Sequence, residues 1–81
     1  MRKKTQDVGF AICIAAKRED DLQLWKVYQI LHDEEAEEIG CLRVIDESGE
    51  DCLYPARRFV IVDLPAEARK QLLKAARRKS A

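Results

Sequence analysis

Large apolar residues alternate with small or polar ones in five short stretches of the chain, and a period of two residues is typical of β-strands. These stretches are rich in β-branched and aromatic residues, and charged or Gly- and Pro-containing segments separate them. The pattern predicts strands over residues 8–15, 23–31, 41–46, 51–54 and 59–63.

The first stretch, VGFAICIA, has two unlike faces. Large side chains occupy one face, whereas the other carries only small residues, at Gly9, Ala11, Cys13 and Ala15. A face of small residues favours the close approach of another element, because little side-chain volume separates the backbones.

The segments between the strands carry turn and cap signals. Residues 16–22 are a charged loop, and the acidic run at 33–39 before a Gly predicts one or two helical turns. A Gly within residues 47–50 predicts a tight turn. Pro55 ends the fourth strand because it has no N–H to donate, and residues 56–58 are expected to form a short 3₁₀ turn.

Residues 66–79 predict a helix, since they contain strong helix formers and no β-branched residue. Pro65 suits the first turn of that helix, and its basic end matches the helix dipole. We expect one domain with a frayed tail over 1–7, a small barrel over 8–63 and the C-terminal helix over 64–79.

Two segments carry a resemblance to a known fold: DDLQLWKVYQIL at residues 20–31 and LYPARRFV at residues 53–60. They resemble the acidic loop and the Pro-led last turn of Src-homology-3 domains, which implies a five-stranded Src-homology-3-like barrel. Peptide-binding members carry a Trp at the start of the third strand, where this chain has Gly40-Cys41-Leu42. The resemblance therefore implies the fold and not the proline-rich ligand.

A second resemblance covers the central signature KVY and RVIDESGEDCLYP. It is similar to a family of short, uncharacterised bacterial proteins with a RVIDESGEDYLYP-like signature, in which an aromatic residue stands in place of Cys52. This likeness implies a bacterial origin and adds support for the fold, but it implies no mechanism.

The 15 basic and 15 acidic residues cancel in number but are segregated along the chain. Residues 1–18 carry a net charge of +4, residues 19–51 of −10 and residues 57–79 of +6. Such segregation can steer a charged partner, or the acidic half of one copy can contact the basic helix of another. Neutralisation within the fold is the alternative.

The cysteines and the N-terminus indicate a cytoplasmic protein. Three cysteines without CxxC spacing are typical of small core residues in a reducing compartment, and the sequence contains neither a signal-peptide pattern nor a membrane span. A zinc site formed by Cys13, His32, Cys41 and Cys52 has no support from their spacing. We therefore expect no metal, no cofactor and no membrane partner.

The only Trp, Trp25, has two interpretations. If Tyr28 and Ile30 point inward, Trp25 points outward and is available as an interaction anchor. Alternatively, the helix or the first loop covers it as part of the core. The other candidate contacts lie on the Pro-led turn and the acidic hairpin, at Tyr54, Phe59, Glu47, Glu50 and Asp51.

The acidic hairpin itself is expected to be a solvated turn. Its four carboxylates, at residues 46, 47, 50 and 51, lack the alternate spacing of a calcium loop. Acid–base catalysis needs burial that separates the pKa values of such groups, and the pattern offers none.

A basic surface is the basis of an alternative function. Nucleic acid binding requires clustered cations, which the helix and the Pro-led turn supply at Arg57, Arg58, Arg69, Lys70, Lys74, Arg77 and Arg78. The helix supplies charge, but no aromatic residue is interleaved in it for base stacking.

His32 next to Asp33 has no identifiable nucleophile or oxyanion donor, and the sequence shows no catalytic constellation. We therefore expect a small non-catalytic protein-interaction module or adaptor. Its partner is another protein or a second copy, and the alternative is a nucleic-acid-associated accessory protein.

Overall fold

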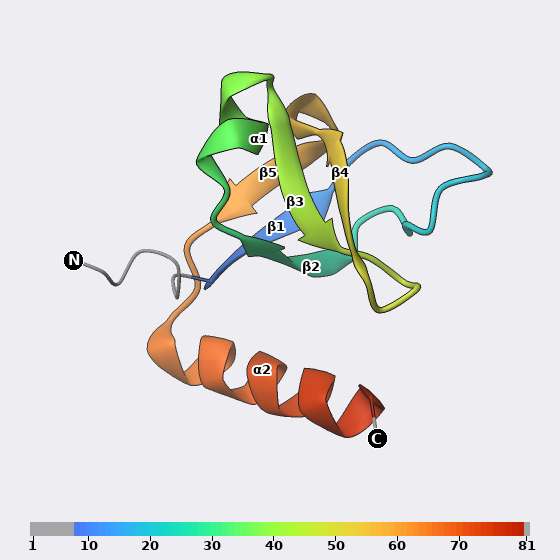
Figure 1. Ribbon diagram of the computed structural model, residues 1–81. Helices are drawn as coiled ribbons and strands as arrows, with labels where there is room; N and C mark the ends of the chain where they lie inside the picture. The colour runs from blue at the N-terminus through green and yellow to red at the C-terminus, as the bar shows by residue number, and fades with distance from the viewer. Residues whose placement is uncertain (1–7, 81) are drawn as a thin grey trace.

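The computed structural model describes residues 8–80 of the chain, with side chains described for residues 9–75 (Figure 1). The elements are β1 (Val8–Cys13), β2 (Val27–Leu31), α1 (Glu34–Glu38), β3 (Cys41–Ile45), β4 (Asp51–Pro55), the 3₁₀ turn η2 (Ala56–Arg58), β5 (Phe59–Val62) and α2 (Ala66–Ser80). The predicted strands, the acidic helical turn, the 3₁₀ turn and the C-terminal helix are all confirmed. The first two strands are shorter than expected, and the predicted tail over 1–7 lies outside the described residues.

The five strands form one antiparallel sheet in the order β4-β3-β2-β1-β5. This order leaves β4 and β5 at its two ends, and no ladder among residues 8–80 joins them. The ends nevertheless approach each other, since the ring centroids of Tyr54 in β4 and Phe59 in β5 lie 6.2 Å apart. The fold is therefore mainly β with a C-terminal helix, while closure into a barrel stays a prediction.

One face of the sheet, called the inner face here, carries the hydrophobic core. Its buried side chains come from four strands and one loop: Ala11, Cys13, Leu22, Tyr28, Ile30, Leu42, Val44 and Phe59. The small face of β1 is thus the core face, whereas the sequence predicted only that another element approaches it closely. Gly9 lies on the same face, where an added Cβ would come within 3.1 Å of Ile30 Cγ1.

The opposite, outer face of the sheet carries Phe10 and Ile12 of β1 and Val27 of β2, because successive side chains of a strand point to opposite faces. Phe10 is only 3% exposed. The Arg69 guanidinium of α2 lies 5.4 Å from the centre of its ring. Figure 1 shows α2 beside the sheet, separated from β3 and β4 by β1 and β2. The helix therefore covers part of the outer face, which the sequence left undecided.

Candidate protein-contact site

The backbone at Trp25 is the most unusual feature of the described chain. Residues 23–26 form a turn in which Lys26 N–H donates to Gln23 O at 3.4 Å. Trp25 has a φ of 68°, in the left-handed region, and it is the only described residue other than Gly there. A turn with positive φ at its third residue ordinarily requires Gly at that position.

A β-bulge follows from this turn. Trp25 N–H donates to Cys13 O at 2.7 Å, and Cys13 N–H donates to Lys26 O at 3.0 Å. Two residues of one strand therefore face the single residue Cys13 of the other, with the left-handed residue first. This is why the second strand begins at Val27 and not at residue 23 as predicted. The bulge redirects the Trp25 side chain, and a bulky residue in this conformation costs about 1–2 kcal/mol.

Trp25 is 85% exposed, so the interpretation as a core residue is wrong. Leu24 and Ile14 are also exposed, and Val60 of β5 is 48% exposed. Ile14 N–H donates to Arg58 O at 2.8 Å, which places Ile14 diagonally across from Val60 on one side of the sheet. We call these four residues, Ile14, Leu24, Trp25 and Val60, the Trp25 patch. Its members are neighbours along the backbone, since Trp25 N–H donates to Cys13 O, directly before Ile14.

The chain around the patch is held in place by a polar cluster. Glu47 accepts from Tyr28 Oη and, at 2.6 Å, from Lys26 Nζ. Gln23 N–H in turn donates to Tyr28 Oη at 2.7 Å. Burial, followed by the hydrogen bond to Glu47, raises the pKa of Tyr28. These contacts tie the loop before β2 to the hairpin that follows β3, so they position the turn that carries Trp25.

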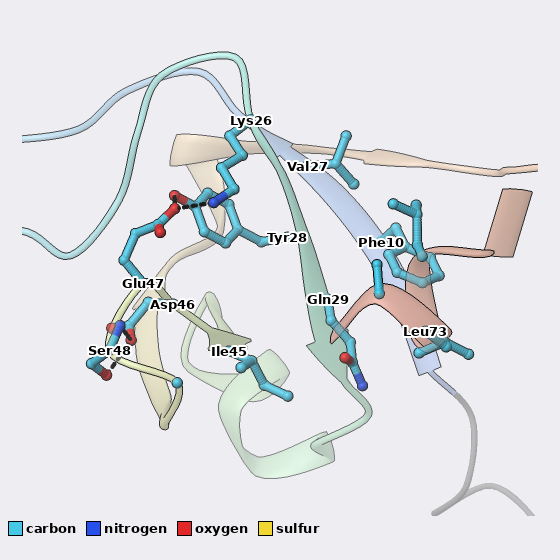
Figure 2. A pocket seen from close by; sticks show the side chains of 13 residues that line it. Phe10, Lys26, Val27, Tyr28, Gln29, Ile45, Asp46, Glu47, Ser48 and Leu73 are labelled. Atoms are coloured by element: carbon cyan, nitrogen blue, oxygen red, sulfur yellow. Dashed lines mark hydrogen bonds and ion pairs between the residues drawn. The ribbon is translucent and has the colours of Figure 1, made fainter. Parts of the chain in front are cut away.

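An open pocket of about 870 Å³ lies between this cluster, the outer face and α2. Figure 2 shows Lys26, Tyr28 and Glu47 at one end of the pocket, with Phe10 and Leu73 at the other. The apolar end is where α2 leaves the outer face partly uncovered. The polar end is occupied by side chains that already bind one another, so it presents no unpaired charge to a ligand.

The acidic hairpin is not uniformly solvated, which corrects the prediction for Asp46. Asp46 is buried and accepts from Ser48 Oγ at 2.5 Å and from Tyr54 Oη at 2.7 Å. Burial raises the pKa of Asp46, but the hydrogen bonds from Ser48 and Tyr54 outweigh it and hold the pKa below its usual value. Asp46 is therefore a buried carboxylate whose hydrogen bonds hold the hairpin turn in place.

The other predicted contacts lie in different environments. Glu50 and Asp51 are exposed, and Asp51 binds Arg43 at 3.0 Å. Tyr54 is half-buried against Asp46. Phe59 is buried in the core and does not reach the surface. The structure does not gather these residues around Trp25.

The predicted basic surface is divided. Arg58 pairs with Asp20, and Arg69 lies over Phe10, so both serve the fold. Arg57, Lys70 and Lys74 are exposed. The side chains of Arg77 and Arg78 lie outside the described part of the chain.

His32 lies 3.7 Å from Glu34 and 3.7 Å from Glu37, and no ion pair joins it to its neighbour Asp33 among the described residues. Asp33 instead caps α1 and pairs with Arg43, and the hydrogen bond from Arg43 lowers its pKa. Within residues 8–80, no three His, Cys, Asp or Glu side chains are placed to hold a metal ion. The three cysteines are free thiols, and Cys13 is in the core.

Comparisons with family models, curated proteins and solved structures found no match to this chain. The likeness to Src-homology-3 domains and to the bacterial signature family therefore stays a prediction. No helix among the described residues is long and apolar enough to cross a membrane.

Sequence reasoning missed the polar cluster and the buried carboxylate. Lys26 and Tyr28 precede Glu47 by about twenty positions, and only the pairing of β2 with β3 brings them together. The one available signal was the Asp-x-Ser-Gly spacing at residues 46–49, which is typical of side chains that cap their own turn.

Proposed function

We propose that this protein is a small, non-catalytic protein-interaction module that binds its partner through the Trp25 patch. The observation that carries the proposal is Trp25 itself, which is almost fully exposed in a conformation that favours Gly. A strained and exposed aromatic residue weakens the free protein. Trp is enriched among residues that dominate binding energy, which gives that cost a function.

The proposal includes a Src-homology-3-like barrel as the scaffold. The strand order, the 3₁₀ turn before β5 and the ring contact between Tyr54 and Phe59 support this fold. With Phe59 buried and no Trp at the start of β3, the aromatic walls of a proline-rich peptide groove are missing. The module therefore binds through another surface, and the exposed turn before β2 is the one that the geometry favours.

Nucleic acid binding is the weaker alternative. Two of the cations that it needs, Arg58 and Arg69, are engaged by Asp20 and by the ring of Phe10. Among the side chains described for residues 9–75, this leaves Arg57, Lys70 and Lys74 of the predicted cations to contact phosphates.

The test is affinity capture with the tagged full chain from lysate of its source organism, with and without nuclease, read by quantitative mass spectrometry. The variants are Trp25→Ala and the matched control Ile39→Ala, which truncates another exposed apolar residue away from the patch. We expect a partner protein that survives nuclease, is retained by Ile39→Ala and is lost with Trp25→Ala. Equal recovery by both variants contradicts the proposal, and recovery that disappears with nuclease favours the alternative.

A second readout uses the single Trp as its own probe. The free protein should show the long-wavelength fluorescence of a solvated indole. Addition of the captured partner should shift the emission to shorter wavelength as the ring is buried. An unchanged spectrum at saturating partner would place the contact elsewhere.

A further inference from the structure

The free edge of β5 is the second unusual surface of the molecule. In the described sheet β5 pairs only with β1, so one row of its backbone groups has no ladder partner. Proteins usually protect such an edge with charge, Pro, a bulge or a covering element. The β5 sequence, Phe-Val-Ile-Val, contains no charge and no Pro.

The hydrogen bonds identify which groups face the open edge. Ile14 N–H donates to Arg58 O, and Ile14 is in register with Arg58 through the pairing of Ile12 with Val60. Backbone groups in an antiparallel strand alternate in direction, so Val60 and Val62 bond to β1. The N–H and C=O of Ile61 and the C=O of Phe59 therefore point away from the sheet. Phe59 N–H is already used, because it donates to Ala56 O.

The opposite edge of the sheet, on β4, is protected against pairing with another strand. Asp46 N–H donates to Glu50 O, so the groups of Asp51, Leu53 and Pro55 face outward there. Pro55 has no N–H to offer, and Asp51 places a charge on the edge. Leu53 is 44% exposed and Ile61 is 64% exposed, so exposure alone does not distinguish the two edges.

We propose that β5 pairs antiparallel with β5 of a second copy of this chain, across a two-fold axis at Ile61, to form a continuous sheet through two molecules. On the axis, Ile61 N–H of each copy donates to Ile61 C=O of the other. Beside it, Asp63 N–H of each copy reaches Phe59 C=O of the other. This register uses the outward groups of β5 and makes no demand on the engaged Phe59 N–H.

The charges at the two ends of β5 are also complementary to β5 of a second copy. Arg57 precedes the strand and Asp63 follows it, both are exposed, and neither has an ion pair among the described residues. In the antiparallel pair, Asp63 of each copy lies opposite Phe59 of the other, which brings the 3₁₀ turn that carries Arg57 toward that carboxylate. The edge is therefore complementary to itself in both hydrogen bonding and charge, which favours a second copy over an unrelated strand.

The test is the mass of the full chain in solution, by sedimentation or light scattering, over about a hundredfold range of concentration up to roughly millimolar. We expect the mass to rise from 9.3 kDa toward twice that value. Ile61→Lys should weaken this self-association at least about tenfold, because it places a charge on the shared edge. Leu53→Lys, the matched change on the β4 edge, should behave as the wild type.

Amide hydrogen exchange gives a readout of the backbone itself. The Ile61 amide should exchange more slowly as concentration rises, while the Leu53 amide should not respond. A wild-type chain that stays monomeric throughout, or a dimer lost with Leu53→Lys and kept with Ile61→Lys, would overturn the proposal. So would an Ile61 exchange rate that does not depend on concentration.

If Ile61→Lys does not fold, the end charges decide instead. Arg57→Asp and Asp63→Arg should each weaken the dimer, and the double exchange should restore it; failure to restore overturns this register. The wild-type dimer should persist as salt rises, since exposed ion pairs contribute only about 0–1 kcal/mol. A mass that falls steeply with salt would instead indicate contact between the acidic half and the basic helix.

Discussion

Both faces of the sheet in this protein carry large apolar side chains, but the faces differ in how completely they are covered. The inner face carries the core, with Val44, Cys13 and Ala11 fully buried. Every buried side-chain N or O described there has a hydrogen-bond partner. The outer face is covered by α2 at Phe10, and it is open at Val60.

This difference indicates that the inner face stabilises the fold, while the exposed surface is available for binding. Burial on the inner face supplies most of the free energy of folding, because the hydrophobic effect scales with the apolar area removed from water. The open part of the outer face contributes little to folding, and at Trp25 the backbone opposes it. A residue such as Trp25 destabilises the free protein and contributes nothing to the core. A binding function would explain why such a residue is present.

The largest test of this comparison is Phe10→Ala, which removes the buried residue of the outer face. We expect the free energy of unfolding to fall by about 3 kcal/mol, since a truncated Phe loses its buried area and leaves a cavity. Urea denaturation measures the loss, and Phe10→Leu serves as the milder control. A loss below about 1 kcal/mol would show that α2 does not depend on this ring.

A matched pair of valines compares the faces directly. Val44→Ala should cost about 2 kcal/mol of unfolding free energy, because the site is fully buried. Val60→Ala should change it by less than about 0.5 kcal/mol, since the side chain is half exposed. Urea midpoints at neutral pH decide the matter, and equal losses would show that the outer face is a second core.

The pH dependence of stability tests the buried carboxylate on the hairpin. The pKa of Asp46 is lower in the folded protein than its ordinary value of 3.8, so its contribution to stability is present above pH 3.8 and lost as pH falls through the folded pKa. We expect stability to decline more steeply in acid for the wild type than for Asp46→Asn. Denaturation from about pH 5 to about pH 2 checks this. Asp33, whose pKa is also lowered, stays in both proteins, so parallel curves would remove Asp46 as a cause.

An effect of opposite sign is expected at Trp25. Trp25→Gly should stabilise the protein by about 1 kcal/mol while abolishing partner binding, because Gly adopts positive φ without the steric cost. Gly49→Ala is the control, since Gly49 has a φ of 88° and no atom within 4 Å of an added Cβ. It should lose about 1 kcal/mol for conformational reasons alone. Destabilisation by Trp25→Gly would mean that the ring supports the fold.

Much of the architecture was predictable from local pattern. The alternation in VGFAIC and in CLRVI, the acidic run before Gly40 and the Ala- and Lys-rich C-terminus each agreed with the element that forms. The second strand was the exception, because QLWK reads as a continuation of VYQIL by alternation. Sequence patterns assign the left-handed conformation to Gly, so they give no signal that Trp25 adopts it.

The candidate site depended on contacts between distant residues. Exposure of Trp25 follows from the bulge opposite Cys13, and burial of Asp46 follows from Tyr54 across the hairpin. Phe59 was predicted as a contact residue on the Pro-led turn but enters the core, where its ring packs against Tyr28. None of these placements is encoded within a few residues of the side chain concerned.

The sequence by itself determined the strands, the helices, the turns and the small face of β1, because periodicity, capping and backbone preference act over short distances. Only the tertiary structure decided which face became the core, which end strand stayed unprotected and which aromatic residue was left in water. Those outcomes depend on strand order and on where α2 lies, and they are set by packing between segments far apart in the chain.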